Sequence, residues 1–149
     1  MARNAAAYDE DFYAWTQEQA RLLRSGDVRS IDIENVAEEI ESMGRSDRRE
    51  VESRLTVLLA DLLKWQFQPA QRSTSWQRTM LEQRRRIAKL LQESPSLAAL
   101  RDKALVGAYP DAREDAALEA GLAIDPLPQA CPYTMEQILN RAFLPDDAA

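Results

Sequence analysis

One carboxylate interrupts an otherwise apolar part of the sequence, and it is the first residue whose type and position suggest chemistry. Between Leu55 and Phe67 the only charged residues are Asp61 and Lys64. On a helix, Asp61 would lie about 80° from the centre of the apolar stripe, which predicts a carboxylate that is at least partly buried. A buried carboxylate needs a partner or a raised pKa. Arg84 falls on the apolar side of its own predicted helix, so we expect it to pair with Asp61.

This buried pair of Asp61 and Arg84 has a structural and a functional interpretation. We favour the structural one, an ion pair or hydrogen-bond network, because buried polar groups normally have partners. The alternative is a general base or a metal ligand in a cleft, since perturbed carboxylates concentrate at functional sites. The variant Asp61→Asn separates the two, because the structural interpretation predicts lower thermal stability with unchanged ligand binding.

A second group of carboxylates has a spacing that could hold a metal ion. Glu34, Glu38 and Glu41 follow one another at intervals of four and three residues, which places them on one flank of a helix. Such carboxylates can bind Mg²⁺ or Mn²⁺ in hydrolases of nucleotides or other phosphate esters. The helical nucleotide pyrophosphohydrolases use Glu-Glu-x-x-Glu and a downstream Glu-x-x-Asp, and this chain has neither pattern. We therefore favour an acidic flank that is solvated or faces a basic partner, and keep the metal-dependent hydrolase, with or without Asp61, as the alternative.

The charged residues divide the chain into acidic and basic segments. Residues 1–42 and 90–149 each carry ten acidic and four basic residues, whereas residues 64–89 carry seven basic residues and one acidic residue. The predicted basic surface consists of Arg78, Arg85, Arg86 and Lys89. Three or four exposed bases on a chain with net charge −6 argue against nucleic-acid binding, and a nucleic-acid or antitoxin-like binder is our third hypothesis.

The composition excludes several kinds of catalytic site. The 149 residues include no histidine, which excludes Ser-His-Asp and Cys-His catalysis, His-ligated zinc and the Glu-x-x-His element of di-iron bundles. The single cysteine, Cys131, excludes a disulfide within the chain and is expected to be a buried structural thiol. We expect no cofactor.

The spacing of apolar residues predicts helices throughout. We expect them at about 8–24, 32–43, 46–67, 75–92, 95–121 and 135–142, with an end or kink at Gly44 and a kink or restart at Pro110. The helix at 46–67 is apolar on most sides, which predicts a central position. The sequence therefore predicts an all-α, single-domain bundle of about five to six helices at 8–145, with flexible tails at 1–7 and 146–149.

No targeting or membrane-spanning segment is expected. The longest all-apolar run, Val57 to Ala60, is far shorter than the roughly 20 residues that span a bilayer. The start of the chain lacks the apolar core of a signal peptide. We expect a cytoplasmic protein.

Four segments of the chain together resemble one protein family. They are residues 8–15 (YDEDFYAW), 32–44 (DIENVAEEIESMG), 62–69 (LLKWQFQP) and 131–134 (CPYT). In this order they resemble the bacterial helical family catalogued as domain of unknown function 29. The resemblance implies a helical bundle and supplies no catalytic residue. It also implies that relatives often carry histidine at the position of Asp61, so chemistry based on that imidazole is not expected here.

The leading functional hypothesis is protein–protein contact, including self-association. It follows from the opposed acidic and basic segments, the many aromatic and leucine positions, and the failure of each catalytic motif. We expect a protein partner or a homo-oligomer.

Overall fold

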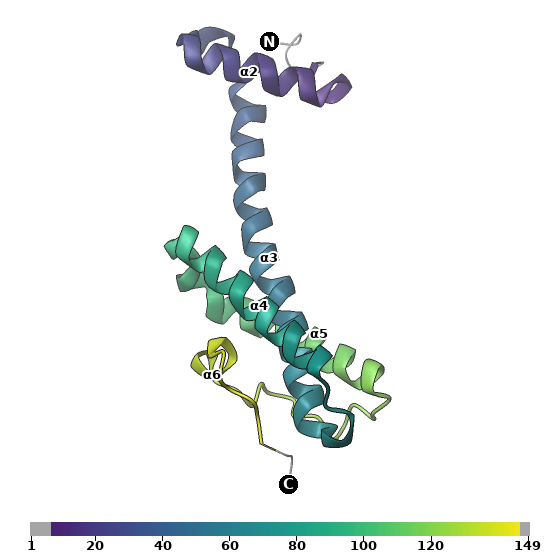
Figure 1. Ribbon diagram of the computed structural model, residues 1–149. Coiled ribbons are helices and arrows are strands. Elements are labelled where there is room, and N and C mark those ends of the chain that lie inside the picture. Colours follow the sequence, from purple (N-terminus) through teal and green to yellow (C-terminus); the bar gives the residue numbers. More distant parts are fainter. Residues whose placement is uncertain (1–6, 147–149) are drawn as a thin grey trace. The chain divides into compact units, whose positions relative to one another are not determined.

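The structure is a computed structural model that describes residues 7–146, and this part of the chain contains helices and no strand (Figure 1). The predicted all-α class is confirmed. The predicted flexible tails at 1–7 and 146–149 fall almost entirely on residues outside the described range. No helix in the described range combines the length and the apolar character that crossing a membrane requires.

The chain divides into two compact units, residues 1–46 and 47–149, and we call their described parts the N-terminal unit (7–46) and the C-terminal unit (47–146). This division does not test the predicted domain boundaries at 8 and 145, which stay a prediction.

The N-terminal unit consists of α2 (Phe12–Ser25), the short helix η1 (Val28–Ser30) and the first turns of α3 (Ile33–Phe67). Helix α2 begins where Asp11 Oδ1 accepts a hydrogen bond of 3.1 Å from the Ala14 amide. It ends at Gly26, whose φ of 76° lies in the left-handed region that favours glycine.

Helix α3 is longer than the sequence predicts. The expected helices at 32–43 and 46–67 form one helix of 35 residues, and α3 runs through Gly44 without a break. Gly44 has no positive φ, unlike Gly26 and Gly121, which follow the last residues of α2 and α5. A glycine inside a helix costs only about 1 kcal/mol relative to alanine, and the residues on both sides of Gly44 are good helix formers.

The C-terminal unit holds the main core. Its elements after α3 are η2 (Pro69–Gln71), α4 (Thr74–Glu93), η3 (Pro95–Leu100), α5 (Arg101–Ala120) and α6 (Met135–Leu139). The predicted central helix is confirmed as the most buried segment of the described chain, because every residue from Leu58 to Lys64 is buried. Buried alanines of α5 join this core (Ala104, Ala108, Ala112, Ala116 and Ala117).

Two further local features concern the last two helices. Thr134 and Gln137 form a capping box at the start of α6. Helix α5 continues from Arg101 through Pro110 to Ala120 without the restart that the sequence allowed, although a proline inside a helix removes one backbone hydrogen bond.

Candidate functional site

Asp61 belongs to a buried charged cluster that joins three helices of the C-terminal unit. Lys64 Nζ lies 2.9 Å from Asp61 Oδ1 and 2.6 Å from Glu119 Oε2. The same ammonium group lies 5.1 Å from the centre of the Trp76 ring, within the range of a cation–π interaction. Asp61 and Lys64 are buried, whereas the Glu119 side chain is exposed. One lysine of α3 therefore links its own helix to α4 and α5.

The electrostatics of this cluster are set by burial and by the shared lysine. Burial raises the pKa of Asp61, and the hydrogen bond and charge of Lys64 oppose this shift without cancelling it. Burial acts to lower the pKa of Lys64, but the hydrogen bonds to Glu119 and Asp61 outweigh it and raise the pKa. Asp61 Oδ2 is buried without a hydrogen-bond partner among the described residues. The cluster therefore holds one ammonium group between a buried carboxylate, that of Asp61, and an exposed one, that of Glu119.

Arg84 is buried as predicted, but the predicted pair with Asp61 is wrong. The guanidinium instead binds the end of α6 and the residues that follow it, donating to three backbone carbonyl oxygens. These are the oxygens of Ile138 at 2.7 Å, Gln137 at 3.4 Å and Arg141 at 3.5 Å. The last carbonyl groups of a helix have no partner within it, and arginine has five donors with which to satisfy them. Asp61 finds its cation one turn further along its own helix, in Lys64.

The predicted metal-binding carboxylates lie on the N-terminal unit, and the structure does not bring all three together. Arg45 lies 2.7 Å from Glu38 and 3.8 Å from Glu41, so two of the three carboxylates are ion-paired with an arginine. Glu34 is exposed. In residues 7–146 no group of three His, Cys, Asp or Glu side chains is placed to hold a metal ion.

The predicted basic surface lies on α4, and all four of its residues are exposed (Arg78, Arg85, Arg86 and Lys89). Arg86 is ion-paired with Glu82, and Lys89 lies 3.8 Å from Glu93. A shallow groove runs along this helix, and its lining includes Arg78, Arg85 and Glu82. Acidic neighbours therefore neutralise part of the basic surface.

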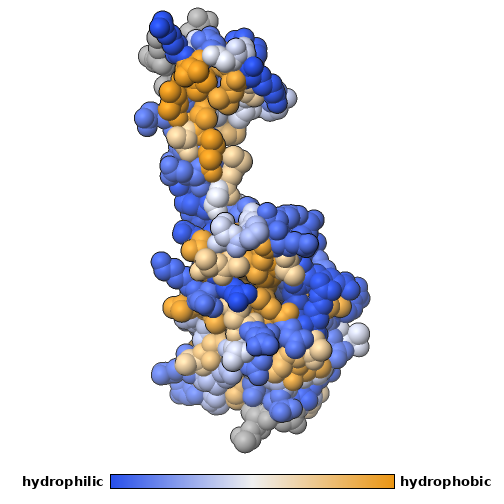
Figure 2. All heavy atoms as spheres, turned by 90° about the vertical axis from the view of Figure 1, so that its left-hand side faces the viewer, coloured by the Kyte–Doolittle hydropathy of each residue, from blue (hydrophilic) through white to orange (hydrophobic). Residues whose placement is uncertain are grey.

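Apolar side chains gather on the outside of the N-terminal unit. Figure 2 shows a concentration of them over this part of the chain. We call the exposed large hydrophobic side chains of residues 7–46 the N-terminal apolar surface. They are Phe12, Tyr13, Leu23, Val28, Ile33, Ile40 and Met43.

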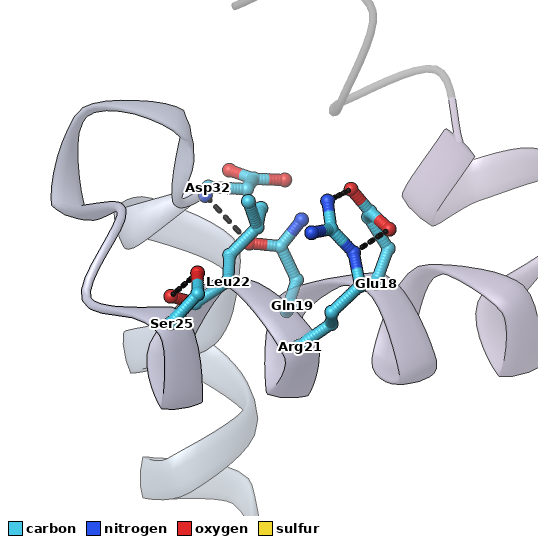
Figure 3. A network of polar contacts seen from close by, with 6 residues as sticks. All are labelled: Glu18, Gln19, Arg21, Leu22, Ser25 and Asp32. Carbon is cyan, nitrogen blue, oxygen red and sulfur yellow. Dashed lines mark hydrogen bonds and ion pairs between the residues drawn. The ribbon is translucent and has the colours of Figure 1, made fainter.

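A polar network inside the N-terminal unit holds α2 against the start of α3. Gln19 is buried, and its side-chain oxygen accepts a hydrogen bond of 2.8 Å from the Asp32 amide (Figure 3). The Asp32 carboxylate accepts hydrogen bonds from Trp15 Nε1 at 3.0 Å and from Asn35 Nδ2 at 2.8 Å. The Tyr8 hydroxyl donates to Glu39, and this hydrogen bond is the main reason that the pKa of Tyr8 rises to about 12.

Sequence analysis missed the N-terminal apolar surface for an identifiable reason. Ile33, Ile40 and Met43 have the spacing of a stripe that faces a core, and the structure leaves all three exposed. Their acidic neighbours Glu34, Glu38 and Glu41 are a signal in the sequence, since an apolar stripe with a polar border is also found at contact surfaces.

Comparison with known proteins identifies a protein family. The family described as Domain of unknown function DUF29 has a model that matches residues 7–144, which is nearly the whole chain and includes both units. No curated protein and no solved structure matches the chain.

Proposed function

We propose, from the premise that this chain belongs to the DUF29 family, that it works through protein–protein contact and that its N-terminal unit supplies the contact surface. The observation that supports this proposal is the N-terminal apolar surface, whose seven side chains belong to a segment of 40 residues. The 100 described residues of the C-terminal unit expose five large hydrophobic side chains. Such a concentration of exposed apolar side chains is typical of a site that binds another protein.

The surroundings of this surface also favour protein contact. Polar and charged residues border the apolar side chains, as they do at the rim of an interface. The network around Asp32 and Gln19 fixes the two helices, so their exposed side chains are presented from a preformed scaffold. Such preorganisation lowers the entropic cost of binding.

The other hypotheses have weaker support in the contacts of residues 7–146. Two of the three carboxylates of the metal-dependent hydrolase are ion-paired with Arg45. Two of the four bases that would contact nucleic acid have acidic neighbours. A cytoplasmic location and a homo-oligomer belong to the same proposal as the protein contact.

The test is affinity purification of tagged chains from the native cell, with quantification of every co-purifying protein, including untagged copies of the chain. The variant Ile40→Glu should lose at least one co-purifying protein, because a charge would have to be buried in the contact. Leu118→Glu is the matched control, since Leu118 is an exposed aliphatic residue of α5 in the C-terminal unit. Identical sets of proteins from wild type, Ile40→Glu and Leu118→Glu would contradict the proposal.

A further inference from the structure

We infer that the occupant of the N-terminal apolar surface is the same surface of a second copy of this chain, so that α2 and the start of α3 from two copies form a four-helix interface. This inference rests on the proposed function and names its partner. It is argued from the size of the core, the spacing of the exposed side chains and the distribution of charge.

The first argument is the size of the core within the N-terminal unit. Of its 40 described residues only Trp15, Gln19 and Leu22 are buried, and one of these is polar. The whole unit, residues 1–46, is close to the size of about 40 residues below which a disulfide, a metal or association is usually needed for stability. The only cysteine of the chain, Cys131, lies in the other unit, and no metal-binding group is found in the described residues. Association with another molecule is the remaining way to stabilise this unit.

The second argument is the spacing of apolar residues along the start of α3. Ile33, Val36, Ile40 and Met43 follow one another at intervals of three, four and three residues, which are the a and d positions of a heptad. Ile33 and Ile40 are each 59% exposed and Met43 is 62% exposed. We call these four residues the seam of α3. A seam with this spacing packs against another helix of the same kind, and a second copy supplies an identical seam.

The third argument sets the direction of the pairing. Asp32 and Glu34 lie at the first turn of α3, and Arg45 lies at the far end of the seam. In an antiparallel pair, the first turn of each copy meets the end that carries Arg45, whose charge is shared with Glu38 and Glu41 of its own copy. A parallel pair would bring the two acidic first turns together. The antiparallel arrangement places Ile33 of one copy opposite Met43 of the other, and Val36 opposite Ile40.

A second copy also satisfies the need for a partner that is always present. A segment whose small core is stabilised by association benefits from a partner that is present from the time of synthesis, and a second copy of the chain is present at equal concentration. The N-terminal unit carries ten acidic and four basic residues, so the two copies as wholes still repel each other. This repulsion is screened by salt. Added salt should therefore strengthen dimerisation. It would weaken the binding of a cationic partner helix to this acidic unit.

The experiment is sedimentation velocity of the full chain over a wide range of concentrations at low and at physiological salt. We expect a dimer that dissociates on dilution and becomes tighter as salt is added. Ile40→Glu and Met43→Glu should each raise the dissociation constant about tenfold or more, and Leu118→Glu should leave it unchanged. Circular dichroism checks that each variant remains helical, and the dilution series of the wild type requires no variant.

The pairing direction is tested by cross-linking in a Cys131→Ser background. A mixture of Ile33→Cys and Met43→Cys chains should form mixed disulfide dimers faster than either chain alone forms its own. Faster cross-linking of each chain to itself would overturn the antiparallel arrangement.

The inference is overturned if the wild-type chain is a monomer at every concentration, or if its association weakens with salt. The proposed function survives that result if Ile40→Glu still loses a co-purifying protein of another kind. Both fail if the chain is a monomer and Ile40→Glu changes nothing.

Discussion

In the C-terminal unit, α3 buries its apolar stripe, whereas in the N-terminal unit the stripe of the same helix is exposed. Leu58 and Leu62 are fully buried, while Ile33, Ile40 and Met43 are more than half exposed. The charges show the opposite distribution, because the C-terminal unit buries Asp61, Lys64 and Arg84, and the N-terminal unit buries no charged side chain among its described residues. The same helical spacing of apolar residues thus occurs in a buried part and in an exposed part of α3. What packs against a helix, and not its periodicity, decides which side chains are buried.

The largest effect should come from the buried charges of the C-terminal unit. Lys64→Met removes the cation that contacts Asp61 and leaves a buried carboxylate without its ion pair. We expect the free energy of unfolding to fall by about 3–5 kcal/mol, measured by urea denaturation at neutral pH. Arg45→Met in the N-terminal unit is the comparison, and we expect a loss below about 1 kcal/mol because its ion pairs are exposed.

The double variant Lys64→Met with Asp61→Leu tests the cause of this loss. It should recover part of the stability, because the orphaned carboxylate is then replaced by an apolar side chain. A double variant no more stable than Lys64→Met would show that packing, and not the buried charge, accounts for the loss.

A smaller effect is expected from shortening one apolar side chain of α3 in each unit. Leu58→Ala creates a cavity in the core and should lower the free energy of unfolding by about 2–5 kcal/mol. Ile40→Ala, studied at a concentration at which the chain is a monomer, should change it by less than about 0.5 kcal/mol. At high concentration Ile40→Ala should become destabilising, because association stabilises the folded state. Equal losses at both positions, independent of concentration, would abolish the contrast between the units.

Much of this contrast lies beyond what the sequence can predict. The helices, the capping box at Thr134 and the burial of Asp61 and Arg84 follow from periodicity and cap residues, because these signals are local. The partners of Arg84 are backbone carbonyl oxygens, which every residue has and which therefore leave no pattern in the sequence. Lys64, three residues after Asp61, was a readable signal, since side chains at this interval meet on a helix.

The exposure of Ile40 could not be predicted for a different reason. The interval between apolar residues is the same whether the facing surface belongs to this chain or to another one. Gly44 is another position at which the sequence allows two structures. A helix ends at a glycine where the backbone becomes left-handed, and otherwise it continues through the glycine. Both cases depend on contacts between distant parts of a sequence or between molecules.

Asp61 in the C-terminal unit and Asp32 in the N-terminal unit both have perturbed pKa values, and the two shifts have opposite signs. Burial raises the pKa of Asp61, so its contribution to stability is present at acidic pH and is lost as the pH rises through its folded pKa. Burial acts to raise the pKa of Asp32 too, but hydrogen bonds from Asn35 and Trp15 outweigh it and lower the pKa. The contribution of Asp32 is therefore present above its unfolded pKa and is lost as the pH falls.

The smallest predicted effect is the pH dependence of two asparagine variants, each of which removes the titration of one carboxylate. Relative to Asp61→Asn, the wild type should gain stability as the pH falls, because the folded chain takes up a proton at Asp61 before the unfolded chain does. Relative to Asp32→Asn, it should lose stability over the same acidic range, because the folded chain holds Asp32 ionised. Urea denaturation at a series of pH values measures both differences. If both stability differences changed with pH in the same direction, the two carboxylates would not differ in the way their surroundings indicate. The electrostatic part of the contrast between the units would then be wrong.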